Sequence, residues 1–89
     1  MNFKPPYTVT VNRRAAKQLE KLPAEVYAVL ESAIDGLALN PRPPGCKKLH
    51  GRGNQWRLRR GDYRIIYEIE DAVLRVLVVE IGHRGAVYA

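Results

Sequence analysis

The sequence has little cysteine and histidine and no long apolar run, and each shortage excludes a class of protein. Cys46 is the one cysteine among 89 residues, which excludes an internal disulfide framework and is typical of a reducing compartment. No apolar run approaches the ~20 residues that a transmembrane helix needs, and the N-terminus lacks the apolar segment of a signal peptide. We therefore expect a cytoplasmic protein with no membrane partner.

Metal ligands and cofactor-binding loops are also scarce. The chain has two histidines and one cysteine, and neither D-x-D nor H-x-x-x-H spacing occurs, so the sequence predicts no metal site. It contains neither a P-loop nor a G-x-G-x-x-G run, and we expect no nucleotide cofactor. A ribonuclease that uses two histidines stays open as an alternative, provided that His50 and His83 converge in the fold.

Positive charge is abundant, and it is concentrated in one segment. The net charge is +6. Residues 42–64 hold eight of the lysines and arginines and one acidic residue, so this segment carries +7 while the rest of the chain carries −1. Such a concentration is expected on a surface that binds phosphates or an acidic partner.

The first half of the chain predicts one strand and two helices. Residues 7–11, "YTVTV", alternate and are rich in β-branched side chains, which indicates a strand. Asn12 can cap a helix that ends at Pro23. A second apolar stripe at helical spacing follows and ends before Asn40, because the residue before a proline avoids the helical conformation. The short joint between the helices predicts an antiparallel helical hairpin.

The second half predicts three strands, at about 54–60, 63–70 and 73–82. The last is apolar on both faces, so we expect it at the centre of the sheet. The segment before them, "KKLHGRGNQ", allows either a short strand or a basic loop. The order β-α-α-β-β-β predicts an α+β fold in which the helical hairpin covers one face of a mostly antiparallel four-stranded sheet. The length allows a single domain over residues 1–89.

Four arginines lie within "QWRLRRGDYRIIYEI", residues 55–69. Gly61-Asp62 suits a two-residue hairpin loop of type II′, and this loop would place Arg59 opposite Arg64. Side chains alternate along a strand, so Arg57 would share their face. The opposite, core face would then hold Trp56, Leu58, Ile65 and Tyr67. Similarly, a loop at Asp71-Ala72 would pair Glu68 with Arg75.

Three arginines on one exposed face repel one another, and a bound anion would attract all three and remove this cost. The alternative is that they are ordinary solvated side chains. Beyond the last strand, "EIGHRGAVYA" leaves the sheet at Gly82 and would bring Arg84 and Tyr88 to the same face. Guanidinium groups bind phosphate oxygens well and would lower the pKa of a nearby tyrosine. An RNA substrate would supply its own 2′-OH nucleophile, with Tyr88 as the candidate base.

The run "W-R-L-R-x-x-D-Y-R-I-I-Y-E-I … V-x-E-I-G-H-R-x-x-V-Y" closely resembles the RelE branch of the RelE/ParE toxin superfamily, and the resemblance extends over nearly the whole chain. It implies a RelE-like fold and a metal-independent endoribonuclease that cleaves mRNA in the ribosomal A site, inhibits translation and needs no cofactor. The implied partners are mRNA, the ribosome and an acidic, RelB-like antitoxin. Matched by motif, the catalytic residues are Arg57, Arg59, Arg64, Arg84 and Tyr88.

In this family a tyrosine acts as the base and an arginine assists the leaving group. The resemblance assigns the first role to Tyr88 and the second to Arg84. Electrostatic stabilisation describes the arginine's role better, because a guanidinium hardly gives up its proton. Other basic residues near the motif are expected to bind RNA or the ribosome: Lys47, Lys48, His50, Arg52, Arg60 and His83. Lysines often stand in the family at the positions of Arg57 and Arg59.

Two other functions remain open. ParE-type relatives share the fold but inhibit DNA gyrase, and in such a toxin the helical hairpin would carry the activity. They generally lack the combined set of basic residues and closing tyrosine, so this set favours the ribonuclease. The third possibility is a nucleic-acid-binding module without catalysis, whose binding would fall steeply with salt.

Overall fold

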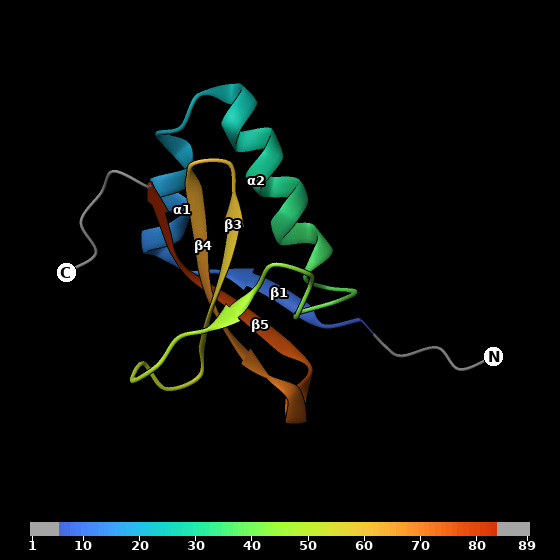
Figure 1. The fold of residues 1–89 in the computed structure, drawn as a ribbon. Coiled ribbons are helices and arrows are strands. Elements are labelled where there is room, and N and C mark those ends of the chain that lie inside the picture. The colour runs from blue at the N-terminus through green and yellow to red at the C-terminus, as the bar shows by residue number, and fades with distance from the viewer. Residues whose placement is uncertain (1–5, 84–89) are drawn as a thin grey trace.

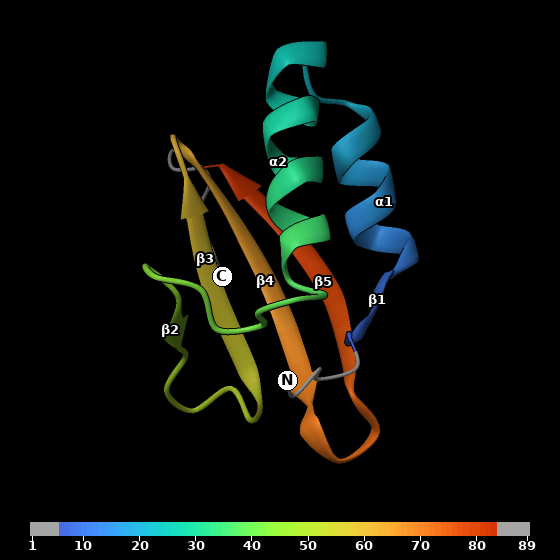
Figure 2. The same ribbon diagram turned by 90° about the vertical axis from the view of Figure 1, so that its right-hand side faces the viewer.

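Two helices pack on one face of a five-stranded mixed sheet (Figures 1 and 2). The structure is a computed structural model that describes residues 6–83. Its elements, in chain order, are β1 (Thr8–Val11), α1 (Arg13–Glu20), α2 (Ala24–Gly36), β2 (Lys47–Lys48), β3 (Gln55–Arg60), β4 (Tyr63–Glu70), a 3-10 turn (Asp71–Val73) and β5 (Arg75–His83). This architecture confirms the predicted α+β fold.

Both helices begin where the sequence indicates. The side chain of Asn12 accepts a hydrogen bond from the backbone N–H of Ala15 at 2.8 Å, which satisfies one of the free donors at the start of α1. Pro23 occupies the N-cap of α2. Leu30 and Ile34 are buried, and Val26 and Ala33 pack against the core, so the predicted apolar stripe is the face of α2 that covers the sheet.

The strand order is β1-β5-β4-β3-β2, with β1 parallel to β5 and the other pairs antiparallel. The sheet therefore has one strand more than the predicted four, because β2 forms in the segment where a short strand and a basic loop were both open. Its two lysines are too few and too polar to produce a strand pattern. The last strand lies between β1 and β4, so β4 and not β5 occupies the centre of the sheet.

The β3–β4 hairpin has the predicted register. Arg60 pairs with Tyr63, Arg59 with Arg64 and Leu58 with Ile65. Gly61 has a φ of 58° while Asp62 is not among the positive-φ residues, which is the sign pattern of a type II′ loop. A residue with a Cβ would be strained at this first loop position, so Gly61 fixes the register and with it the face on which each arginine lies.

The β4–β5 connection differs from the prediction. Instead of a two-residue loop, a 3-10 turn is followed by Leu74 in the left-handed conformation, with a φ of 51°. Arg75 therefore pairs with Glu70, with 3.6 Å between the charged groups, and Glu68 pairs with Leu77. The predicted pair of Glu68 with Arg75 is wrong by two residues. A shift of two positions keeps each side chain on its face, so the face assignment survives.

A β-bulge next to Ile66 and Tyr67 inserts one extra residue into β5. Ile66 pairs with Glu80 and Tyr67 with Val78, so Val79 has no opposite residue. The bulge allows Val78 and Ile81, which are three positions apart, to point into the same core. Where β1 has ended, the side chain of Gln18 on α1 accepts a hydrogen bond from the backbone N–H of Ile81 at 2.7 Å.

The core lies between the helices and one face of the sheet. Its residues have at most 7% of their surface exposed: Ala15, Leu19, Leu30, Ile34, Leu37, Leu58, Ile65, Tyr67, Ile69, Val76, Val78 and Ile81. Trp56 packs against this cluster as a partly buried residue. The predicted core face of the hairpin is therefore confirmed, and Arg57, Arg59 and Arg64 lie on the other face.

Asp71, in the turn before β5, joins three parts of the chain. Its carboxylate accepts a hydrogen bond from the Tyr7 hydroxyl at 2.6 Å and two from the Arg42 guanidinium, at 2.9 and 3.1 Å. The guanidinium also lies over the Trp56 ring, 4.8 Å from its centroid. The bonds from Arg42 and Tyr7 hold the pKa of Asp71 at about 2, below its ordinary 3.8.

We expect Asp71→Asn to lower the stability of the protein at neutral pH but not in strong acid. Because the folded pKa of Asp71 is lowered to about 2 from its ordinary 3.8, the carboxylate stabilises the fold fully above about pH 4 and loses this effect as pH falls towards 2. Urea unfolding of both proteins at pH 7 and near pH 2 measures the difference. An equal difference at both pH values would contradict a role of the charge.

Candidate functional site

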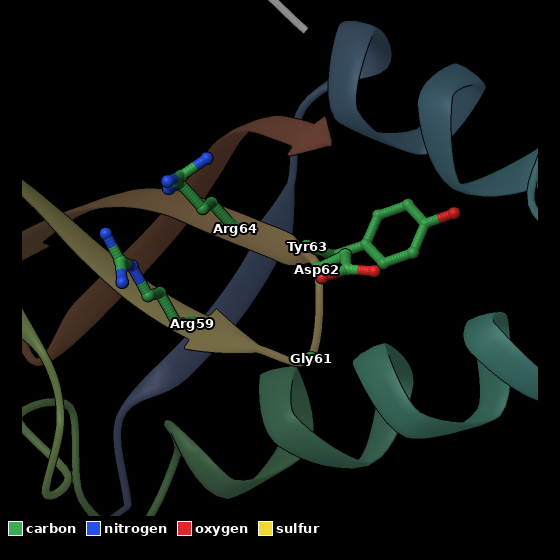
Figure 3. A pocket seen from close by; sticks show the side chains of 5 residues that line it. All are labelled: Arg59, Gly61, Asp62, Tyr63 and Arg64. Carbon is green, nitrogen blue, oxygen red and sulfur yellow. The ribbon is translucent and has the colours of Figure 1, made fainter. Parts of the chain in front are cut away.

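Arg57, Arg59 and Arg64 lie on the face of the sheet that the helices leave uncovered, and we call these three residues the arginine face. Arg59 and Arg64 are directly paired across β3 and β4, and Arg57 is two positions from Arg59 along β3. In Figure 3 the side chains of Arg59 and Arg64 project to the same side, whereas the Tyr63 ring points away from them towards the helices. The structure thus brings together three of the five predicted catalytic residues.

The residues that pair with the arginine face across the strands carry no acidic group. Arg57 stands opposite Ile66, which is 2% exposed but is not a member of the main core cluster. Arg64 stands opposite Gly82 of β5, a residue without a side chain. Like charges directly opposite each other destabilise an antiparallel pair. A face built in this way is less stable without a bound anion than with one.

The end of the β3–β4 hairpin is hollowed. An open pocket of about 460 Å³ is lined by Arg59, Gly61, Asp62, Tyr63 and Arg64 (Figure 3). Two guanidinium groups at its wall can each donate two parallel hydrogen bonds to phosphate oxygens. The hollow therefore suits a phosphate group, and the exposed Asp62 is the one acidic residue that lines it.

The predicted RNA-binding residues before β3 divide between two faces. Lys47 pairs with Arg57 and so belongs to the same side of the sheet as the arginine face. Lys48 pairs with Trp56 and belongs to the other side. His50 and Arg52 are exposed in the loop that joins β2 to β3.

Arg60 and His83 do not join the arginine face. Arg60 pairs with Tyr63 on the helix side, donates a hydrogen bond to the Arg59 carbonyl at 2.8 Å and lines a groove along α2. His83 also pairs with Tyr63, and the two rings meet edge to face with 4.9 Å between their centroids. His50 lies near Gln55, at the other end of β3, so the two histidines do not converge and a two-histidine mechanism is excluded.

Arg84 and Tyr88, the other two predicted catalytic residues, lie outside the described residues. The predicted departure from the sheet at Gly82 is wrong, because β5 continues through Gly82 to His83. Tyr67 is no substitute for Tyr88 as a base, because burial raises its pKa and its hydroxyl donates to the Pro41 carbonyl at 2.8 Å. The hydrogen bond to Asp71 likewise raises the pKa of Tyr7.

Sequence reasoning missed the role of Arg42, which it counted with the other basic residues of segment 42–64. Arg42 is bound to Asp71, 29 positions away, and to the Trp56 ring, so it supports the fold and not the arginine face. No local pattern connects residues so far apart. Among residues 6–83, no three His, Cys, Asp or Glu side chains are grouped to hold a metal ion, and no helix of this part is long and apolar enough to cross a membrane.

Comparisons with known proteins agree with this fold. Residues 9–88 match the family model described as ParE toxin of the type II toxin–antitoxin system parDE. Two toxins of Mycobacterium tuberculosis are similar in sequence over 84 residues. RelG is 33% identical, and the match covers 93% of this chain and 97% of RelG. RelE is 34% identical, and the match covers 93% of this chain and 87% of RelE.

Solved structures of such toxins share the fold. The toxin–antitoxin complex RelBE2 of M. tuberculosis has a chain with a TM-score of 0.79 and 32% identity, covering 89% of this chain and 99% of that one. The archaeal RelE–RelB complex of Pyrococcus horikoshii gives 0.81 and 29%, covering 92% and 99%. The chain therefore belongs to the RelE/ParE family of toxins from type II toxin–antitoxin systems.

Proposed function

We propose that this toxin is a metal-independent endoribonuclease that cleaves mRNA in the ribosomal A site and so stops translation in the cytoplasm. The observation that carries the proposal is the direct pairing of Arg59 with Arg64, with Arg57 beside them, on the open face of the sheet. A structural sheet face gains nothing from opposed arginines, whereas a phosphodiester in reaction needs preorganised cations. The similarity to a toxin of M. tuberculosis named RelE supports a RelE-type activity.

The reaction follows from these groups. The 2′-OH of the RNA attacks the adjacent phosphorus while its proton passes to the Tyr88 phenolate. The bond from phosphorus to the 5′-oxygen breaks, which leaves a 2′,3′-cyclic phosphate and a 5′-hydroxyl that takes its proton from water. Arg57, Arg59 and Arg64 stabilise the charge on the phosphorane oxygens, and Arg84 stabilises the departing 5′-oxygen. The RNA supplies the nucleophile, so these steps place no role on a metal.

The partners follow from the same charge. A ribosome would present rRNA phosphates to the exposed basic residues Lys47, His50 and Arg52, as well as to Arg60 and His83 on the other side of the sheet. Relatives crystallise in complex with RelB antitoxins. We infer that this toxin has an acidic, RelB-like antitoxin, which would neutralise it by covering basic residues of the sheet or the helical hairpin.

Expression of the toxin without an antitoxin should arrest translation and yield mRNAs cut within codons. Purified toxin should cleave mRNA on programmed ribosomes, and the cyclic phosphate at the new 3′ end should be detectable by its resistance to ligation until a phosphatase that acts on cyclic phosphates removes it. The Arg64→Ala and Tyr88→Phe variants serve as inactive controls. Variants as toxic as the wild type would show that the proposed mechanism is wrong.

Gyrase inhibition is the second candidate, because the matching family model is described as a ParE toxin. In that case the α1–α2 hairpin would carry the activity and the arginine face would be dispensable. A supercoiling assay with DNA gyrase, run beside the ribosome assay, separates the two functions. Inhibition of supercoiling without mRNA cleavage would favour the ParE-type activity.

A further inference from the structure

We propose that Lys47 extends the arginine face into a track that binds two consecutive phosphates of single-stranded RNA. Arg59 and Arg64 would hold the scissile phosphate, and Lys47 and Arg57 would hold the phosphate next to it. This inference rests on the proposed function, since it names how the same site holds its substrate. It assigns Lys47 a defined position that its neighbour Lys48 does not share.

The cross-strand register carries the proposal. Lys47 pairs with Arg57 across β2 and β3, and Arg59 pairs with Arg64 across β3 and β4. Directly opposite residues of an antiparallel pair lie on the same face, about 4.5–5.5 Å apart at their Cβ atoms. Two pairs of cations therefore stand side by side on three strands, and together they cross the open face diagonally.

The spacing of the two pairs suits a nucleic acid backbone. Arg57 and Arg59 are two positions apart on β3, which corresponds to about 7 Å along the strand. Consecutive phosphates of an extended single strand are separated by a similar distance. Each phosphate has two free oxygens, so it can lie between the two cations of one pair and receive charge-assisted hydrogen bonds from both.

Polar and acidic residues border the track. Beyond Arg57 on the same face comes Gln55, which pairs with Glu68 and donates a hydrogen bond to its carboxylate at 3.4 Å. Beside the track on β5, Glu80 is bound to Arg14 of α1 with 3.4 Å between the charged groups. Among residues 6–83, the cations of the track are therefore limited to these two pairs, which suits about two phosphates.

Lys48 provides a matched control within the same strand. Both lysines are exposed and belong to the two-residue strand β2, but Lys48 pairs with Trp56, which packs against the core on the other side of the sheet. A general effect of positive charge would involve Lys47 and Lys48 equally. An effect of the track would involve Lys47 alone.

The test measures the binding of a short single-stranded RNA in which every 2′-OH is methylated, so that it cannot be cleaved. Affinity of the purified toxin is measured over a range of salt for the wild type, Lys47→Gln, Lys48→Gln and Lys47→Arg. We expect Lys47→Gln to bind about fivefold more weakly at low salt and to reduce the salt slope by about 0.7, the value for one phosphate contact. Lys47→Arg should restore both, and Lys48→Gln should match the wild type.

Equal effects of Lys47→Gln and Lys48→Gln, or no binding by the wild type, would overturn the track. A polyglutamate peptide is the second probe, and dependence on Lys47 for this peptide alone would also overturn it in favour of a protein-binding surface. Ribosome-dependent cleavage is measured separately. If RNA binding depends on Lys47 but the wild type does not cleave mRNA, the track is supported and the proposed function is wrong. If the wild type cleaves mRNA but Lys47→Gln binds RNA as the wild type does, the proposed function is supported and the track is wrong.

Discussion

Arg59→Ala is expected to reduce ribosome-dependent mRNA cleavage by about 10²–10³-fold, the usual effect of removing one group that stabilises transition-state charge. Arg59 is exposed and stands directly opposite Arg64. Its removal relieves the repulsion between like charges, so the free energy of unfolding should stay within about 0.5 kcal/mol of the wild type or rise. Single-turnover cleavage and urea unfolding of the same preparations measure the two effects.

Arg75→Ala is the matched control. Arg75 is an exposed arginine of β5 that pairs with Glu70, an opposite charge, in the same sheet. Its removal should leave cleavage unchanged and lower stability by up to about 1 kcal/mol, as for other exposed ion pairs. If Arg59→Ala lost stability and kept its cleavage rate, the arginine face would be an ordinary solvated surface.

The opposed arginines could be predicted from the sequence because the information is local. Gly61 and Asp62 fix a two-residue loop, and the residues on either side pair by counting outward from it. Alternation along a strand then assigns each side chain to a face. The helices could be predicted for the same reason. The cap at Asn12 and the apolar stripe of α2 depend on residues that are close together in the sequence.

Features that depend on distant contacts could not be predicted. The 3-10 turn before β5 holds Asp71 where Tyr7 and Arg42 reach it, and these residues are 64 and 29 positions away. The bulge in β5 could not be predicted because that strand is apolar on both faces. An extra residue therefore leaves the hydrophobic pattern of the strand unchanged. The pairing of β2 depends on two lysines that have no strand signal of their own.

For the candidate site, the sequence predicted which basic residues are present but only partly how they are arranged in space. The basic segment is evident from the sequence, whereas the strand register determines on which side of the sheet each basic residue lies. Lys47 lies on the side of the arginine face, whereas Lys48 and Arg60 lie on the other. Charge alone therefore overestimates the surface that would hold the substrate strand, and among residues 6–83 the strand pairing places four of these cations together on it.

Tyr88→Phe should lower the cleavage rate by about 10²–10⁴-fold, the usual contribution of a general base, with little change in the binding of methylated RNA. The substitution removes one hydroxyl and no charge at neutral pH. The ordinary pKa of tyrosine is about 10, and guanidinium groups near the substrate would lower it. The cleavage rate of the wild type should therefore rise with pH up to that lowered pKa, and the rate of Tyr88→Phe should not.

Tyr27→Phe is the control for the loss of a tyrosine hydroxyl. Tyr27 is 38% exposed on α2, and a hydrogen bond with Glu31 raises its pKa. The Tyr27→Phe substitution should therefore change neither the cleavage rate nor its pH dependence. If Tyr88→Phe kept the rate and the pH dependence of the wild type, Tyr88 would not be the base, and His83 would be the candidate instead. That outcome would require the His83 ring to leave Tyr63, where it now packs edge to face, so a Tyr63 variant would then change the rate as well.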